Sequence, residues 1–411
     1  MKHKNLVLNL FVILAGIVIF SCPALYAGSD AGLEQGKWCP SVKAKLDDLI
    51  TKNAGQGKIV VFDFDNTMIC RDIQESTFAA MLKDKKLTPG NIPASISPPF
   101  TLDGKTISPD TAKDLSEYYE EFLLATKHHA GEQTPYSNSY AWVVQILAGM
   151  SPSEILPYSE KAYAEGIGSK DSESADLKET KIYGYRQPFF YPEMADLAGI
   201  LLKKGYKVYF VSASNVWSVR WLVLKKLLPM IQSRHGKELN ISPDHVIGVS
   251  ILLKDRRTGK LCKDQLLVKE NNAYANLDRK ELANYELTTQ IVFPLTGYFG
   301  KVANIFKHIT ASRPFLIAGD SPNDLPMLNH AENRLWITRL EKIGYQEKVV
   351  KQIKNSLPGE WLMQPVLYKK SPGFVASQAD LDQRLSVKPS VKEKTGNTVK
   401  FLKEAGFLQD F

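Results

Sequence analysis

The stretch Lys58-Ile-Val-Val-Phe-Asp-Phe-Asp-Asn-Thr67 joins an apolar run to an acidic loop. Its first half, residues 58–62, is continuously apolar after Lys58 and follows Gly57. Such a run is typical of a strand that is buried on both faces, as in a parallel sheet. Its second half places Asp63 and Asp65 where that strand ends. These ten residues therefore predict both a parallel sheet and an acidic site at its edge.

Three later segments repeat the strand pattern. Residues 207–211, 314–318 and 334–338 are further apolar runs, and helical patterns at 191–204 and 301–309 precede two of them. Strands that alternate with helices indicate a parallel sheet covered on both faces. We predict an α/β fold with a Rossmann-like three-layer core.

Two insertions are predicted to interrupt this core. The segment between the first two strands is much longer than a crossover helix requires, and we expect residues 76–186 to form a large helical cap. A smaller β-hairpin insertion is expected at about 245–268, where Asp255 to Gly259 has the composition of a turn. The core is then residues 28–75 and 187–364, and a basic C-terminal extension follows at 365–411.

The first 27 residues have the features of a secretory signal peptide. Lys2 and Lys4 form a basic head, residues 6–20 are almost entirely apolar, and small residues lead to Ala27. The apolar run is shorter than the ~20 residues of a membrane-spanning helix. We expect a periplasmic or secreted protein. Lipidation of Cys22 is the alternative, and membrane association is expected only in that case.

Charge and cysteine content narrow the function further. The chain has 52 Lys and Arg against 44 Asp and Glu, a formal net charge of +8, but no recognisable nucleic-acid-binding module. Removal of residues 1–27 would leave Cys39, Cys70 and Cys262. The absence of a Cys-x-x-Cys motif argues against structural zinc. A disulfide between Cys39 and Cys262 could form after export.

Polar residues follow the predicted strands in a series. The set consists of Asp63, Asp65, Thr67, Ser212, Lys301, Asp320 and Asp324. Ligands of an open α/β sheet bind at the carboxyl ends of its strands, so we expect these side chains to converge. Clustered carboxylates need a cation, and ligands that offer only oxygen favour Mg²⁺. An ammonium and two hydroxyls in the same crevice suit a phosphate group, which one aspartate could attack while another acts as acid and base.

This series resembles the phosphatases of the haloacid dehalogenase-like superfamily. The resemblance implies that Asp63 is the nucleophile and that Asp65 is the general acid and base. It also implies that Thr67, Ser212 and Lys301 bind the phosphate.

The same resemblance implies a magnesium site. Mg²⁺ would be bound by Asp63, by the backbone carbonyl of Asp65 and by Asp320, while Asp324 would orient metal-bound water. The dehalogenases of the superfamily lack the second aspartate of the first motif, so Asp65 argues against dehalogenation.

From Trp38 to about residue 353 the chain is similar to the secreted phosphorylcholine phosphatases of Gram-negative bacteria. Its last motif departs from that family, because Asp320 and Asp324 have the commoner spacing without an extra residue. The matching segments are Val61–Thr67, Ala141–Gln145, Val246–Val249, Leu252–Lys254, Arg257–Gly259 and Ala318–Pro322.

A substrate head group would need its own partners. Phosphoserine phosphatases have an acidic residue nine positions after the nucleophile, which here is Asp72, with Glu75 one turn further on. Either carboxylate could pair with an ammonium or quaternary amine, or could lie on a solvated helix face. Tyr118, Tyr119 and Trp142 are candidate aromatic partners, although aromatic residues at helical spacing are commonly core.

The sequence therefore predicts a Mg²⁺-dependent phosphomonoesterase whose partner is a small phosphomonoester, with phosphorylcholine or phosphoethanolamine favoured. A phosphoserine phosphatase-like hydrolase and a phosphotransferase remain alternatives with the same motifs. An exported phosphate-ester binding protein without turnover is a third alternative, but such a protein has no use for Asp65.

Overall fold

The fold is taken from a computed structural model. It describes residues 32–34, 36–97, 99–102, 104–111, 115–119, 138–165, 187–369, 371–386, 389–409 and 411. The predicted signal peptide and Cys22 lie outside these residues, as does much of the predicted cap. No helix in the described ranges is long and apolar enough to cross a membrane.

A seven-stranded sheet forms the centre of the fold. Every neighbouring pair in it is parallel except β13 with β14, which is antiparallel. The predicted α/β fold is therefore confirmed. In spatial order the strands are β14 (Gly373–Phe374), β13 (Trp361–Leu367), β12 (Asn333–Arg339), β11 (Leu316–Gly319), β1 (Ile59–Phe62), β6 (Lys207–Asn215) and β7 (Val246–Val249).

Strand β1 lies inside this order, not at an edge, because the chain builds the sheet outward in two directions. From β1 it continues to β6 and β7 on one side, and β11, β12 and β13 then follow on the other. Val60 pairs with Val208 of β6 and with Leu316 of β11. The carboxyl ends of β1 and β11 are thus a topological switch point of the sheet. The loops after these two adjacent strands run in opposite directions there and leave room for a ligand.

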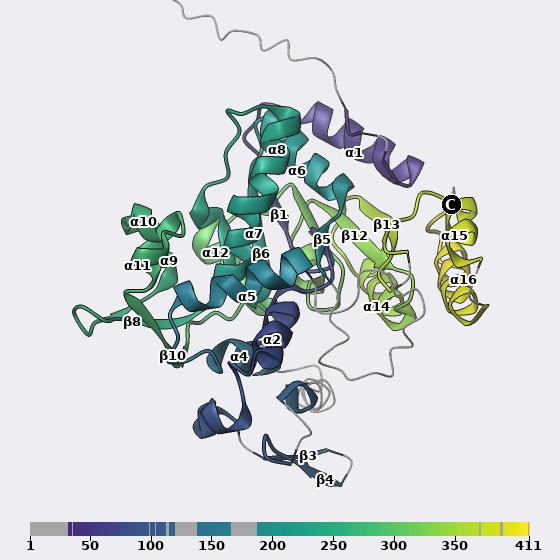
Figure 1. Cartoon of the computed structure of the whole chain (residues 1–411). Helices are drawn as coiled ribbons and strands as arrows, with labels where there is room; N and C mark the ends of the chain where they lie inside the picture. Colours follow the sequence, from purple (N-terminus) through teal and green to yellow (C-terminus); the bar gives the residue numbers. More distant parts are fainter. Residues whose placement is uncertain are drawn as a thin grey trace, which may run out of the picture. The chain divides into compact units, whose positions relative to one another are not determined.

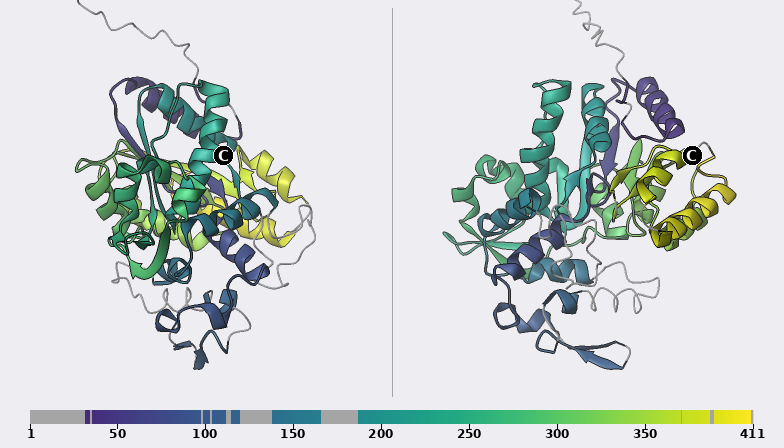
Figure 2. Two further views of the ribbon diagram at one scale, coloured as in Figure 1. Left: turned by 60° about the vertical axis from the view of Figure 1, so that its left-hand side comes forward. Right: turned by 45° about the vertical axis from the view of Figure 1, so that its right-hand side comes forward.

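Helices pack on either side of the sheet (Figure 2). Their apolar faces close a continuous core with strand residues such as Val60, Phe210 and Ile317, which are fully buried. The helices of this layer are α1 (Pro40–Lys52), α6 (Pro192–Lys203), α7 (Val216–Leu222), α8 (Leu228–His235), α12 (Phe299–His308), α13 (Leu325–Asn329) and α14 (Ile343–Ile353), with a π-helical turn at Val223–Leu227.

The first insertion leaves and rejoins the core through a short ribbon. Strand β2 (Ile69–Cys70) pairs antiparallel with β5 (Phe189–Phe190), and Arg71 donates to the carbonyl of Gln187 at 2.5 Å. The described elements between them are α2 (Ile73–Lys83), two 3₁₀ turns at Pro89–Asn91 and Ala94–Ile96, the hairpin β3 (Phe100–Leu102) and β4 (Lys105–Ile107), α4 (Asn138–Gln145) and α5 (Pro152–Glu165).

The second insertion follows β7. Its small antiparallel sheet has the order β10 (Tyr285–Ile291), β8 (Ile251–Asp255) and β9 (Leu261–Cys262), accompanied by α9 (Asp264–Glu270), α10 (Asn272–Ala275) and α11 (Arg279–Leu282). The two insertions touch, since Leu287 of β10 exchanges backbone hydrogen bonds of 2.8 Å with Gly149 and Met150. A buried ion pair between Arg220 and Asp264 joins α9 to the core helix α7, with 2.7 Å between Nη2 and Oδ2.

The C-terminal stretch completes the far edge of the sheet. Figure 1 shows α15 (Gln378–Leu385) and α16 (Pro389–Glu404) at the β13 end, opposite the elements of the second insertion. Phe374 and Leu402 are buried there. The domain bounds expected from the sequence stay predictions.

The cysteines in the described ranges, Cys39, Cys70 and Cys262, are free thiols. The disulfide considered between Cys39 and Cys262 is therefore not present. The reason lies in their placement: Cys39 is buried beside β13, where its N–H donates to Gln364 at 2.8 Å, whereas Cys262 lies in the small sheet of the second insertion.

Candidate active site

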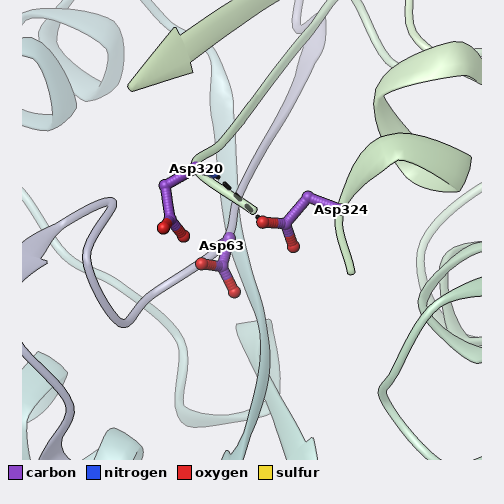
Figure 3. Close-up of side chains that lie close together, drawn as sticks. All are labelled: Asp63, Asp320 and Asp324. Atoms are coloured by element: carbon purple, nitrogen blue, oxygen red, sulfur yellow. Dashed lines mark hydrogen bonds between the residues drawn. The ribbon is translucent and has the colours of Figure 1, made fainter. Parts of the chain in front are cut away.

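Three aspartates meet at the carboxyl ends of β1 and β11. One carboxylate oxygen from each of Asp63, Asp320 and Asp324 lies within 4.8 Å of the others, and all three residues are buried. Figure 3 shows their carboxylates directed toward one another. The topological switch point of the sheet therefore contains a compact acidic cluster.

Backbone contacts fix the loops that present these carboxylates. The N–H of Asp63 donates to Ala318 at 2.9 Å, which continues the pairing of β1 with β11 beyond the strand. Asp324 Oδ2 accepts from the backbone N–H groups of Asp320 at 3.1 Å and Ser321 at 3.0 Å. A Cβ on Gly319 would lie 2.6 Å from the Cβ of Asp324, so only glycine permits this approach.

Lys301 supplies a cation to the cluster. Its ammonium lies 2.5 Å from Asp63 Oδ1 and 2.6 Å from Asp324 Oδ1, and the side chain is 1% exposed. The start of α12 is fixed by Gly300, where a Cβ would lie 1.8 Å from the carbonyl oxygen of Leu295. Lys301 is thus held against two of the three carboxylates.

Asp65 points to a different set of partners. Its Oδ2 accepts from Ser212 Oγ at 3.1 Å and Ser214 Oγ at 2.7 Å, and its Oδ1 accepts from the N–H of Ile73 at 2.7 Å. Its carboxyl group is not part of the acidic cluster of Asp63. Any contact of Asp65 with a metal would therefore use its backbone carbonyl.

Burial dominates the electrostatics of the site. Burial, together with Asp324, raises the pKa of Asp63 to about 7 against the opposing effect of Lys301. Burial also raises the pKa values of Asp65 and Asp320 well above their usual range. Burial disfavours the charge of Lys301, but Asp324 and Asp63 outweigh it and raise the pKa of the ammonium. A further cation would stabilise the ionised carboxylates.

The donor set fits a hard divalent cation such as Mg²⁺. It consists of one carboxylate oxygen from each of three buried aspartates, and such oxygen ligands suit a hard cation. Thr67 is fully buried beside them, and its hydroxyl lies 3.1 Å from Asp63 Oδ2. Ser212, predicted to bind the phosphate, donates its hydroxyl to Asp65, and its role at a phosphate stays a prediction.

The predicted head-group residues fall into two groups. Asp72 is the N-cap of α2 and accepts from the N–H of Glu75 at 2.9 Å, and Glu75 accepts from the hydroxyl of Tyr119 at 3.3 Å. Tyr118 and Tyr119 are buried against Trp142, with ring centroids 5.0 and 6.1 Å from it. These three rings form an aromatic core within the cap.

Several residues around the site were not predicted from the sequence. Ser214 lies two positions after Ser212, a spacing that puts both side chains on the same face of a strand. Arg339 ends β12, and its Nη2 lies 2.6 Å from Asp320 Oδ2. Burial raises the pKa of Tyr140, and the charges of Tyr298, Tyr345, Glu75 and Asp72 raise it further. No sequence spacing relates Tyr140, Tyr298 and Tyr345 to the site. Arg339, however, directly follows a predicted strand and could have been included.

The chain is 28% identical to a phosphorylcholine phosphatase from Pseudomonas aeruginosa over 351 residues, which cover 83% of this chain and 91% of that protein. The chain is a homologue of a phosphorylcholine phosphatase. This confirms the predicted resemblance and the predicted class of phosphoric monoester hydrolase.

One solved structure agrees with the fold. A conserved protein of unknown function from Anaerococcus prevotii aligns over 84% of this chain and 97% of its own, with 18% identity and a TM-score of 0.53. A hydrolase of the haloacid dehalogenase family from Salmonella enterica aligns over 67% of this chain with 14% identity and a TM-score of 0.31, too distant to bear on fold or activity. No protein-family model matches the chain.

Proposed function

We propose that the chain is a Mg²⁺-dependent phosphomonoesterase that forms a phospho-aspartate (an acyl phosphate) on Asp63, with a cationic alcohol as the favoured leaving group. The observation that supports this most is the separation of two acidic environments in one loop. Asp63 faces Lys301 and the other cluster carboxylates, whereas Asp65 faces hydroxyls and one N–H. Asp63 and Asp320 would hold the Mg²⁺, which supplies positive charge to the phosphate oxygens.

The first step transfers the phosphoryl group to the protein. An oxygen of Asp63 attacks phosphorus while the bond from phosphorus to the alcohol oxygen breaks. Asp65, kept protonated by burial, gives its proton to the departing oxygen. Lys301, 2.5 Å from Asp63, offsets negative charge as the bond forms.

The second step returns the protein to its starting state. Asp65, now a carboxylate, takes a proton from a water molecule as that water attacks phosphorus. The bond from phosphorus to Asp63 breaks, inorganic phosphate leaves, and Asp65 is again protonated. Ser212 and Ser214 can hold Asp65 in place through both steps, because hydroxyl groups donate to a carboxylate and also accept from a carboxylic acid.

The preference for a cationic alcohol rests on the homologue's substrate and on residues near Asp72 and Glu75. Three tyrosines in this neighbourhood, Tyr140, Tyr298 and Tyr345, are partly exposed, unlike the buried rings of the cap core. A quaternary amine over such rings gains ~0.5–2 kcal/mol, and a nearby carboxylate adds to this.

The proposal is tested by assaying purified, EDTA-treated protein with and without added Mg²⁺. Phosphorylcholine, phosphoethanolamine, phosphoserine, glycerol phosphate and an aryl phosphate form the substrate panel, with Asp63→Asn as control. We expect activity only with Mg²⁺, none in Asp63→Asn, and a kcat/KM for a cationic substrate roughly 2- to 30-fold above glycerol phosphate.

Each contrary result has a separate meaning. Full activity after chelation would exclude the metal role, and turnover by Asp63→Asn would exclude that nucleophile. A preference for phosphoserine would contradict the head-group assignment. Tight binding of esters without release of phosphate would indicate a binding protein.

A further inference from the structure

Arg339 makes a contact that the proposed reaction does not explain. It is the last residue of β12 and is buried, and its Nη2 lies 2.6 Å from Asp320 Oδ2. The two atoms form an ion pair without the alignment of a hydrogen bond. The other oxygen, Asp320 Oδ1, faces the hydroxyl of Thr67 at 3.4 Å. The two oxygens of this carboxylate therefore have different surroundings.

Two aromatic rings hold the guanidinium of Arg339. Its Cζ lies 5.1 Å from the ring centroid of Tyr345 on α14 and 5.4 Å from that of Tyr368, which follows β13. Glu341 fixes the Tyr368 segment by accepting from the N–H groups of Tyr368 and Lys369 at 3.1 and 3.2 Å. Stacking fixes the plane of an arginine fork and so the direction in which it points.

Arg334 on the same strand is a buried arginine that contacts only structural partners, and it serves as a comparison for Arg339. It is fully buried and stacks on Trp361 at 5.5 Å, but its donors go to the backbone carbonyls of Leu328, Glu332 and Pro358. Arg339 instead directs its charge at a carboxylate of the acidic cluster. The two arginines share strand, burial and stacking, and differ in the group that they contact.

We propose that Arg339 is a positioning residue for the metal ligand Asp320. Held by Tyr345 and Tyr368, it engages Oδ2 and so keeps Oδ1 on the side of Asp63 and Thr67, where a divalent cation would bind. Removing such a partner of a ligand typically weakens metal affinity by ~10- to 100-fold. The inference rests on the proposed function, because it requires the cation that Asp63 and Asp320 would share.

The test measures binding of Mn²⁺ to metal-free full-length protein by electron paramagnetic resonance, alongside thermal unfolding. We expect Arg339→Gln to bind Mn²⁺ roughly tenfold or more weakly than wild type, and Arg339→Lys, which keeps the charge but not the stacked fork, to fall between them. Arg334→Gln is the matched control: it should lower the melting temperature but keep wild-type affinity.

An Arg339→Gln affinity within twofold of wild type would overturn the inference, as would an equal loss in Arg334→Gln. If Arg339→Gln does not fold, Tyr368→Leu removes one stacked ring only, and unchanged Mn²⁺ affinity in that variant would also overturn it. Failure of wild-type protein to bind Mn²⁺ would instead refute the metal site of the proposed function itself.

Discussion

Asp63 and Asp65 are two residues apart, yet their carboxyl groups meet different chemistry. Asp63 lies against the ammonium of Lys301, which lowers its pKa, although burial and Asp324 raise that pKa to about 7 overall; a bound cation would favour the ionised form that a nucleophile needs. Asp65 is surrounded by neutral donors, and burial raises its pKa, which favours the protonated form that a general acid needs. Two environments in one loop can thus assign opposite roles to identical side chains.

Replacement of Asp65 by Asn tests the acid role. The amide has the same shape and can still accept the N–H of Ile73, so the fold should survive, which the melting temperature checks. General acid help contributes ~10²–10⁴-fold, mainly for poor leaving groups. We therefore expect kcat for phosphorylcholine to fall by about that factor and kcat for p-nitrophenyl phosphate to fall much less. Equal losses on both substrates would remove the acid role from Asp65.

At the scale of elements, helix α2 connects the loop that carries Asp63 and Asp65 to the cap. Two carboxylates close its N-terminus: Asp65 accepts from Ile73, and Asp72 accepts from the N–H of Glu75. Asp72 therefore has a structural task whether or not it meets a substrate. Replacing it by Ala would confuse the two functions, since loss of an N-cap costs about 1 kcal/mol of stability.

A pair of variants separates these functions. Asp72→Ser keeps an N-cap hydroxyl and removes the charge, whereas Asp72→Ala removes both. If the charge contributes to the head-group site, both variants should raise KM for phosphorylcholine by roughly three- to fivefold, about the worth of a partly exposed ion pair. KM for p-nitrophenyl phosphate should not change. A wild-type KM in Asp72→Ser would limit Asp72 to capping.

Sequence patterns predict the elements that obey a simple period. The apolar runs at 58–62, 207–211 and 314–318 correspond to β1, β6 and β11, because a doubly buried strand has little choice but to be apolar. Strand β13 was not predicted from the sequence. Gln364 and Pro365 interrupt its apolar run, and only the fold shows that the Gln364 amide is used to bind the backbone of Cys39.

The candidate site likewise has a part that the sequence predicts and a part that it does not. The aspartates at the strand ends could be predicted, since strand order alone brings them together. The sequence places Arg339 at a strand end and Ser214 on the same strand face as Ser212, but which aspartate each side chain contacts is seen only in the structure. The cap aromatics are a related case: their spacing fits a binding face and a core equally well, and Trp142 lies in a core.

At the scale of the whole molecule, the acidic cluster forms only when distant parts of the chain meet. Asp63 and Lys301 are 238 residues apart, and Thr67 and Asp320 are 253 apart. The unfolded chain leaves these groups solvated and separate, so the cost of burying the carboxylates falls on folding itself. The stability of the protein should therefore report on the protonation of the site.

The expected dependence on pH follows from the sign of the pKa shifts. Asp63 has a pKa of about 7 when folded and 3.8 as its ordinary value, so the folded chain binds more protons between these limits. The free energy of unfolding of metal-free protein should then fall as pH rises from about 4 to 7. Asp65 and Asp320 act in the same direction. His308, with its pKa lowered to about 4, acts in the opposite direction.

Asp63→Asn isolates the site from these other groups, because His308 titrates alike in both proteins. In EDTA, wild type should lose stability relative to Asp63→Asn between pH 5 and pH 8, by an amount on the order of 1–3 kcal/mol. Mg²⁺ binds the ionised carboxylates, so its stabilising effect on wild type should grow over the same range, to ~2.7 kcal/mol at a concentration 100 times its Kd. Urea unfolding at pH 5, 6, 7 and 8 measures both quantities. Parallel pH profiles for the two proteins would show that Asp63 does not change its pKa on folding. A Mg²⁺ increment equal at pH 5 and pH 8 would show that Asp63 does not bind the metal as an ionised carboxylate.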